Sequence, residues 1–209
     1  MITERREVDD ARSYPSATFI GVLEKAIAGR RTSSPKRLLA PGPDDAQLER
    51  MLLAAAAAPD HGQLLPWRFI RIGLKGREAL GCAFTQALRA RDALATELQC
   101  AQAAAKAHNA PVLLVAIARL DPEEGSGRIR SAEKLVSLGC AIQNLLLAAY
   151  GLGFQSALTS GQAIDAAPVR AFLRLGAHEE AVCFINLGTE SSPRVARTRP
   201  SAASFYSEI

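Results

Sequence analysis

An acid and an imidazole lie side by side in a loop bounded by two prolines, within residues 57–69 (Ala-Ala-Pro-Asp-His-Gly-Gln-Leu-Leu-Pro-Trp-Arg-Phe). The first proline cannot continue the alanine-rich helix predicted before it, and Pro66 biases Leu65 toward an extended backbone. His61 can offer either ring nitrogen to a ligand, and Asp60 can orient it. Loops held on rigid elements tend to carry binding residues, although a lone loop histidine is more usually a surface residue without a role.

A cluster of cations and hydroxyls follows the amphipathic helix predicted for residues 16–29. Arg30 and Arg31 come first, and residues 32–34 (Thr-Ser-Ser) add three hydroxyls. Two arginines at this place ordinarily interact with the helix C-terminus, for a few tenths of a kcal/mol each. Guanidinium groups next to hydroxyls also suit a phosphomonoester, which carries about two negative charges. The cluster is therefore a candidate phosphate site.

Two weaker signals lie toward the C-terminus. Residues 159–161 (Thr-Ser-Gly) follow a predicted strand at 154–158, and this composition is common in ordinary turns. The tail carries Arg194, Arg197 and Arg199, and a solvated basic tail is the ordinary interpretation. Neither signal identifies a ligand by itself.

Taken in order and spacing, four motifs of the chain resemble the nitroreductase superfamily, in particular its short NAD(P)H nitroreductase branch. The resemblance covers residues 18–205, and no single motif decides it. The four motifs are Arg30-Arg31-Thr32, the Ala-Pro-Asp-His…Pro-Trp-Arg-Phe segment, Thr159-Ser160-Gly161 and Leu187-Gly188-Thr189.

The resemblance implies FMN as cofactor and a homodimer that holds it at the subunit interface. It implies that Arg30 and its two neighbours contact the phosphate and ribityl chain, that His61 approaches the flavin, and that residues 158–160 lie beside the ring. A C-terminal arginine would reach the phosphate, and the alanine run 54–58 suits either helix packing or a flat ring. The expected cofactor-binding residues are Arg30, Arg31, Thr32, Ala57, His61, Leu158, Thr159, Ser160, Arg197 and Arg199.

The implied function is an FMN-dependent oxidoreductase that uses NAD(P)H to reduce nitroaromatics, quinones or related acceptors by a ping-pong mechanism. No catalytic side chain is expected, because the flavin itself carries the hydride. Ser34 and Ala57 stand where the superfamily often has a base near the flavin N1 edge, and Leu65 where many relatives have glutamine. Lys36 or Arg37 would have to supply the missing cation.

These departures keep alternatives open. The chain could bind or sequester flavin without reductase turnover, form a dimeric scaffold without cofactor, or perform another chemistry of the same fold, such as dehalogenation or flavin fragmentation. Flavin retained without NAD(P)H oxidation would favour the first alternative, and a colourless dimer would favour the second.

Composition excludes several other classes. Of 209 residues 48% are hydrophobic and 22% charged, and the net charge of +4 is too mild to argue for nucleic acid. The four cysteines are widely spaced, which argues against a metal site and against a disulfide framework. There is no run of 18 apolar residues and no signal-peptide core, so we expect a cytoplasmic protein that neither spans nor binds a membrane.

The predicted elements give an α+β fold in which a mixed sheet of four or five strands is surrounded by helices. Strands are expected at 67–72, 112–118, 154–158 and 181–187. Helices are expected at 16–29, at 77–107 with an irregular tip around residues 91–92, and after each of three N-caps, Asp44, Ser131 and Asp165. Gln47 should complete a capping box with Asp44. Neither a Rossmann glycine motif nor a P-loop is present. We expect residues 1–15 to be a flexible extension and residues 16–209 to form one FMN-binding domain.

Overall fold

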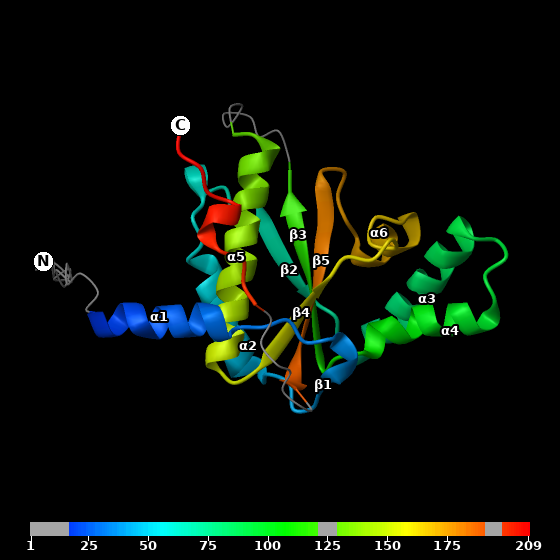
Figure 1. Ribbon diagram of the computed structural model, residues 1–209. Helices are drawn as coiled ribbons and strands as arrows, with labels where there is room; N and C mark the ends of the chain where they lie inside the picture. The colour runs from blue at the N-terminus through cyan, green and yellow to red at the C-terminus, as the bar shows by residue number, and fades with distance from the viewer. Residues whose placement is uncertain (1–16, 121–128, 191–197) are drawn as a thin grey trace, which may run out of the picture.

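A computed structural model describes residues 17–120, 129–190 and 198–209 (Figure 1). The expected N-terminal extension, residues 1–15, lies outside the described residues. So do Arg194 and Arg197 of the basic tail.

One antiparallel sheet forms the centre of the α+β fold. β5 (Glu179–Glu190) is flanked over the same residues by β3 (Val112–Arg119) and β4 (Gln155–Thr159), which therefore lie on opposite edges of it. β2 (Trp67–Arg71) pairs with β3, and the short β1 (Leu38–Leu39) pairs with the last two residues of β5.

The prediction of a mixed sheet is wrong for the described strands, because all four strand pairs are antiparallel. β3 and β4 are connected through α5 (Ser131–Gly151) and run in the same direction, but β5 lies between them, so they never pair. Within the described residues the parallel contact is an isolated bridge between Thr32 and Ser156.

Helices cover both faces of the sheet. α2 (Asp45–Ala56) and α5 pack on one face, and α3 (Leu74–Arg91), α4 (Glu97–Ala105) and α6 (Ala167–Leu173) lie on the other (Figure 1). Successive side chains of a strand point to opposite faces, which is why β3 is apolar throughout. Leu114, Ala116 and Ala118 belong to the core under α2 and α5, whereas Leu113, Val115 and Ile117 belong to the core under α3 and α6.

α5 is the central helix of the first layer. It is long and apolar enough to cross a membrane by length and composition alone, but Leu138, Ala141 and Leu145 are fully buried against the sheet. This burial is what a core helix shows. The predicted caps at Ser131 and Asp165 are both wrong. Arg130 and Ala166 occupy the N-cap positions of α5 and α6, and no side chain caps the first turn of either helix.

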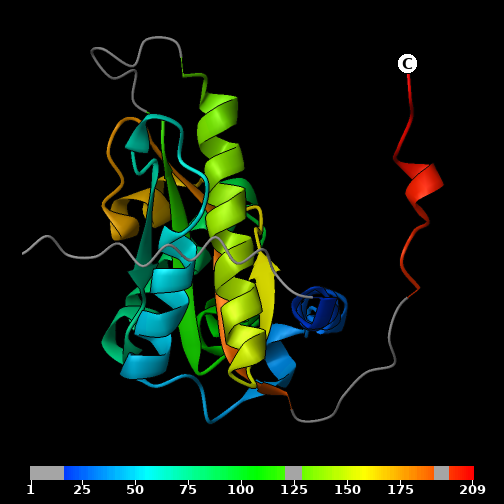
Figure 2. The same cartoon turned by 90° about the vertical axis from the view of Figure 1, so that its left-hand side faces the viewer.

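α1 (Ala17–Gly29) and the C-terminal segment from residue 198 stand away from this layered body (Figures 1 and 2). α1 contacts α5 near the end of α1 and leaves apolar side chains in solvent, including Val22 at 62% exposure. Two segments that flank the predicted phosphate cluster are therefore the least embedded parts of the described chain.

Candidate functional site

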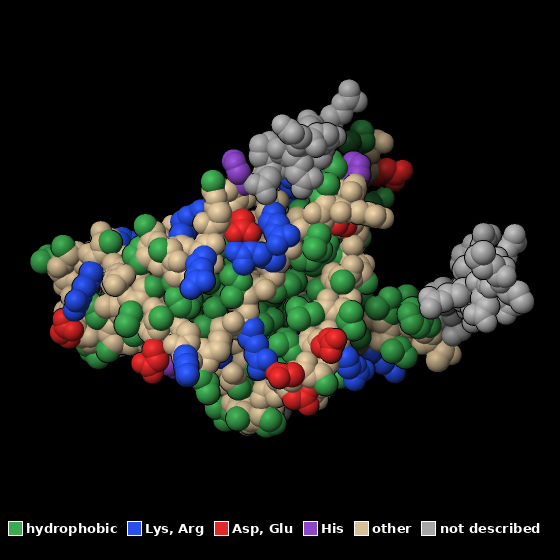
Figure 3. Space-filling model, turned by 180° about the vertical axis from the view of Figure 1, so that it is seen from behind, with side chains coloured by type: hydrophobic (Ala, Val, Ile, Leu, Met, Phe, Trp, Pro, Cys, Tyr) green, Lys and Arg blue, Asp and Glu red, His purple; other side chains and the backbone are tan. Residues whose placement is uncertain are grey.

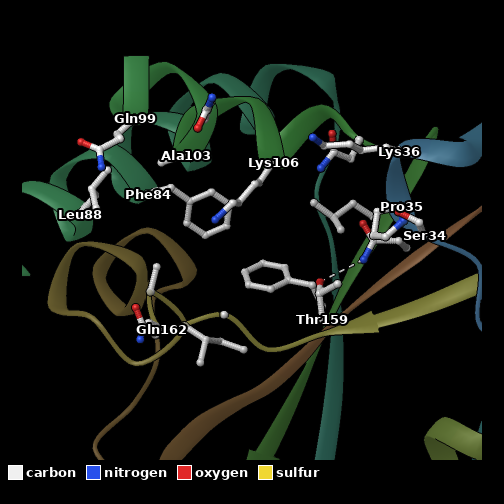
Figure 4. A pocket seen from close by; sticks show the side chains of 18 of the residues that line it. Ser34, Pro35, Lys36, Phe84, Leu88, Gln99, Ala103, Lys106, Thr159 and Gln162 are labelled. Atoms are coloured by element: carbon white, nitrogen blue, oxygen red, sulfur yellow. Dashed lines mark hydrogen bonds between the residues drawn. The ribbon is translucent and has the colours of Figure 1, made fainter. Parts of the chain in front are cut away.

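A cavity of about 560 Å³ lies on the face of the sheet that carries α3 and α4 (Figure 4). Leu113, Phe184 and Asn186 of β3 and β5 contribute to its wall on the sheet side, and α3 and α4 contribute the opposite wall. Residues 34–36 close one end, and residues 159–164 run along the side. Pockets of this size and mixed lining hold cofactor-sized ligands.

Aromatic and aliphatic groups form the middle of the cavity. The Phe84 ring of α3 meets the Phe184 ring of β5 edge to face, with centroids 5.6 Å apart and planes at 77°. Leu88 and Ile164 extend this apolar wall. A flat ring system could contact it without burying an unpaired polar group.

The charges around the cavity all have one sign. Lys36, Arg91 and Lys106 line it, and no Asp or Glu is among the residues that line it. Lys106 extends from the short helix η3 (Lys106–His108) into the cavity beside the Phe84 ring (Figure 4). Such a site favours an anionic ligand, because nothing within the lining neutralises the cations.

Arg77 holds the segment that carries Lys106. Its guanidinium is buried and donates to the carbonyls of Ala107, Ala110 and Pro111, at 3.0, 2.6 and 3.0 Å. Burial lowers the pKa of Arg77 below its usual value. Three hydrogen bonds from one planar group fix the turn between η3 and β3 and thereby the position of Lys106.

Among the predicted site residues that the structure describes, Thr159 lines the cavity. Asn186 donates its amide to the Thr159 hydroxyl at 3.1 Å (the dashed line in Figure 4) and to the carbonyl of Ala157 at 3.3 Å. Because the Thr159 oxygen accepts here, its own proton is left to donate to a ligand. Leu158 and Ser160 are exposed on either side and do not line the cavity.

The predicted phosphate cluster lies on the extended segment that leads into the cavity. Ser33 is buried, and its N–H donates to the Ser156 carbonyl at 3.0 Å, which fixes the segment against β4. Thr32 and Ser34, on either side of it, are exposed. Alternation therefore presents the hydroxyls of Thr32 and Ser34 outward while Ser33 anchors the backbone.

Two predicted arginines from opposite ends of the chain meet at this segment. The Arg199 guanidinium donates to the carbonyl of Arg30 at 3.2 Å. Burial, and secondarily the nearby charge of Arg199, lower the pKa of Arg30 below its usual value. Neither side chain has a carboxylate partner in the described residues. Two like charges held together without a counter-ion favour binding of an anion. Arg31 is exposed beside them.

Ala57 and His61 lie elsewhere in the same chain. Ala57 is the C-cap of α2, and His61 begins the short helix η2 (His61–Gln63), so both are on the face of the sheet opposite the cavity. The ring Nδ1 of His61 contacts Glu133 of α5 at 3.1 Å, and Asp60 does not orient it. Within one chain these two residues cannot contact a ligand in the cavity.

The loop around His61 differs from the predicted conformation. Leu65 has φ of +46° instead of an extended backbone, although Pro66 follows it. The Asp60 carboxylate accepts the N–H groups of Leu64 and Leu65 at 3.2 and 2.7 Å, which stabilises this unusual turn. A left-handed leucine is costly, so the loop depends on that carboxylate.

Sequence reasoning missed Phe84, Arg91, Lys106 and Asn186 as cavity residues, because each lies in a regular helix or strand without a motif. It raised Lys36 and Arg37 together; Lys36 lines the cavity, whereas Arg37 pairs with Glu190 at 3.6 Å. Lys106 had one usable sequence signal: it lies shortly before the Asn-Ala-Pro segment that ends the helix and leads into a buried strand.

Redox or metal chemistry from the protein's own side chains has little support in the described residues. They contain no group of three or more His, Cys, Asp or Glu side chains placed to hold a metal ion. All four cysteines are unpaired; Cys100 and Cys183 are buried, and burial raises the pKa of Cys183 to about 11. A reactive thiolate is therefore not expected at that position.

Comparison with known proteins identifies the family of the chain. Residues 27–189 match the family described as the Nitroreductase family. The chain belongs to the nitroreductase family. A Haemophilus influenzae protein described as a candidate NAD(P)H nitroreductase is 31% identical over 156 residues, covering 75% of this chain and 83% of its own. An Escherichia coli protein of the same description is 29% identical over 163 residues, covering 78% of this chain and 85% of its own.

Solved structures of nitroreductases share the fold. A nitroreductase-like family protein from Bacillus cereus superposes with a TM-score of 0.75 at 19% identity, covering 94% of this chain and 97% of its own. A variant of an FMN- and NADPH-dependent nitroreductase from Sphigopyxis sp. strain HMH has a TM-score of 0.70 at 19% identity, covering 88% and 97%. Membership of the nitroreductase family supports an oxidoreductase activity for the chain.

Proposed function

We propose that the protein is an FMN-dependent oxidoreductase that uses NAD(P)H to reduce nitroaromatic, quinone or related acceptors. Bound FMN would supply the redox chemistry, taking hydride from NAD(P)H in one half of a ping-pong cycle and delivering it to the acceptor in the other. The protein's own residues bind, orient and set the electrostatics of the site.

The observation that carries this proposal is the Arg30–Arg199 pair at the start of the segment that leads into the cavity. These arginines, with Arg31 and the Thr32 hydroxyl, would hold the phosphate and ribityl groups. Arg197 keeps its proposed role at the phosphate but lies outside the described residues. A dianionic phosphate would relieve the repulsion between the two guanidinium groups.

The cavity suits the flavin ring in size, shape and charge. Phe84 and Phe184 offer an apolar wall, and residues 158–160 with the Thr159 hydroxyl offer polar contacts at the side. Lys36 and Lys106 would stabilise the negative charge that a reduced flavin gathers at its N1 edge. They would replace the base missing at Ser34 and Ala57.

A second copy of the chain would complete the site. Ala57 and His61 face away from their own chain's cavity, so we propose that each contacts the flavin of a partner in a homodimer. Hydrophobic side chains gather along the projecting α1 (Figure 3), with Phe19, Ile20, Val22, Leu23 and Ile27 exposed. An apolar helix held out in solvent is typical of an element that packs against another subunit.

Substitution of Arg30 tests the phosphate site. A hydrogen bond to a charged group contributes about 1.5–3 kcal/mol, so Arg30→Ala should weaken FMN binding about 10- to 150-fold. Titration of the flavin-free protein with FMN, followed by flavin fluorescence, measures the dissociation constant.

Arg50→Ala is the matched control, because this substitution removes the same charge. Arg50 is exposed on α2, which packs on the face of the sheet opposite the cavity. Its dissociation constant should equal that of the wild type. Unchanged FMN affinity in Arg30→Ala would remove Arg30 from the site.

A further inference from the structure

The cavity has two ends with different chemistry. Ser34, Lys36 and Thr159 lie at one end, where the phosphate segment enters, and Leu88, Gln99 and Gln162 lie at the other (Figure 4). Phe84 and Lys106 stand between them. A ring placed at the first end would leave the second end, beneath the tip of the α3–α4 hairpin, to another ligand.

Arg91 lines the cavity from the last residue of α3, beside this second end. It has no hydrogen-bond or salt-bridge partner in the described residues. The nearest acids in sequence are engaged elsewhere and do not line the cavity: the Asp92 side chain accepts the Leu94 N–H at 3.0 Å, and Glu97 pairs with Arg89 at 2.6 Å. The Arg91 charge is therefore not neutralised from within the chain.

Amide donors surround the same end. The Gln99 side-chain oxygen accepts the N–H and hydroxyl of Thr96 at 2.8 and 3.0 Å as part of the cap of α4. That engagement fixes the amide and leaves its two N–H donors for another acceptor. Gln102 and Gln162 line the cavity as well. A guanidinium with several amide donors and no carboxylate suits a planar anion such as a carboxylate.

We propose that this outer end binds the anionic substituent of an aromatic acceptor, so that the enzyme prefers carboxylated nitroaromatics to neutral ones. The inference rests on the proposed function. Arg91 and Gln99 would hold the carboxylate, while Phe84 and Leu88 contact the ring. The reducible group at the opposite side of the ring would then point toward the Lys36 end.

The test compares two acceptors that differ in charge and hardly in shape, para-nitrobenzoate and para-nitrobenzamide. Arg91→Gln should lower kcat/KM for para-nitrobenzoate about tenfold, through KM, which corresponds to one charged hydrogen bond. The value for para-nitrobenzamide should stay unchanged, and so should the ratio of kcat/KM for NADPH to that for NADH. Arg89→Gln is the matched control. The substitution removes the same charge two residues away, at a side chain that pairs with Glu97 and does not line the cavity.

A measurement without turnover separates this inference from the proposed function. Calorimetry of the wild type with benzoate and benzamide should show tighter binding of benzoate, and Arg91→Gln should remove the difference while Arg89→Gln keeps it. Equal losses on both acceptors, or equal binding of both ligands to the wild type, would overturn the inference. A fall in the NADPH-to-NADH ratio alone would overturn it too, since the anion would then be the donor's phosphate. A wild type that reduces neither of these acceptors nor a quinone would contradict the proposed function, and the benzoate titration would still decide the anion site.

Discussion

Glu179 connects three strands through one carboxylate. It accepts Nε and Nη2 of Arg68 on β2 at 2.6 and 2.7 Å, lies 3.7 Å from Arg119 on β3, and accepts the Gly176 N–H at 3.1 Å. The Arg68 hydrogen bonds, opposed by desolvation, lower the pKa of Glu179 to about 2. The side chain is 17% exposed, so this is a half-buried, bidentate pair instead of an isolated surface contact.

The lowered pKa gives a pH-dependent prediction. A carboxyl with a folded-state pKa below its unfolded value stabilises the protein fully above the unfolded value, and that stabilisation is lost as pH falls toward the folded pKa. Glu179→Gln should therefore lower the free energy of unfolding by about 1.5–3 kcal/mol at pH 7. The difference from the wild type should shrink between about pH 4.5 and pH 2.

Urea unfolding at pH 7 and pH 2.5 measures both effects. Glu180→Gln is the control: Glu180 is the next residue, is exposed and has no partner in the described residues, so it should be neutral at both pH values. A Glu179→Gln deficit of the same size at pH 7 and pH 2.5 would show that the ion pair is not its cause.

Single residues were predictable where local chemistry marks them. The cluster at residues 30–34 stood out because cations and hydroxyls adjoin, and the structure brings Arg30 together with Arg199. Lys106 had only its place before the Asn-Ala-Pro stop as a signal, because it is the fold that brings it beside the Phe84 ring. Leu65 was predicted wrongly, because the Asp60 side chain outweighs the local preference imposed by Pro66.

Elements were predictable where hydrophobic periodicity is strong. The sequence patterns located α1, α2 and β3 to within a few residues, since each has one apolar face or is buried on both faces. The capping box at Asp44 and Gln47 is confirmed, with both reciprocal hydrogen bonds present. Sheet direction was not predictable, because the insertion of β5 between β3 and β4 depends on long-range pairing that leaves no local signal.

The exposed apolar face of α1 gives a prediction at this scale. The double substitution of Ile20 and Ile27 by serine should dissociate the proposed homodimer. Burial of apolar surface at the interface contributes about 25 cal/mol per Å², and both exposed isoleucines would lose this contribution. Light scattering would then report the 22.2 kDa monomer instead of twice that mass. FMN content should fall in parallel, since Ala57 and His61 of the partner would leave the site.

The control replaces Glu24 and Lys25, which are charged and exposed on the same helix, with serine. This double variant should keep the mass of the wild type. A wild type that is monomeric at micromolar concentration, or a double serine variant at Ile20 and Ile27 that remains dimeric, would contradict the role given to α1.

At the scale of the whole molecule, the fold places the pieces of the site in two groups. The arginine pair, Thr159 and the cavity lie on one side of the sheet, and Ala57 and His61 lie on the other. The proposed homodimer would unite both groups in one site. It would thus explain why one sequence carries two separated sets of candidate flavin contacts.

The most direct test of the central claim is the visible absorption spectrum of the purified protein, before and after addition of NADPH without oxygen. We expect a yellow protein with the bands of oxidised flavin, which bleach when NADPH is added and return with para-nitrobenzoate. A yellow protein that neither NADPH nor NADH bleaches would point to a flavin binder without turnover. A colourless protein that also takes up no added FMN would contradict the proposed flavin site and return Arg30 and Arg199 to the role of ordinary surface cations.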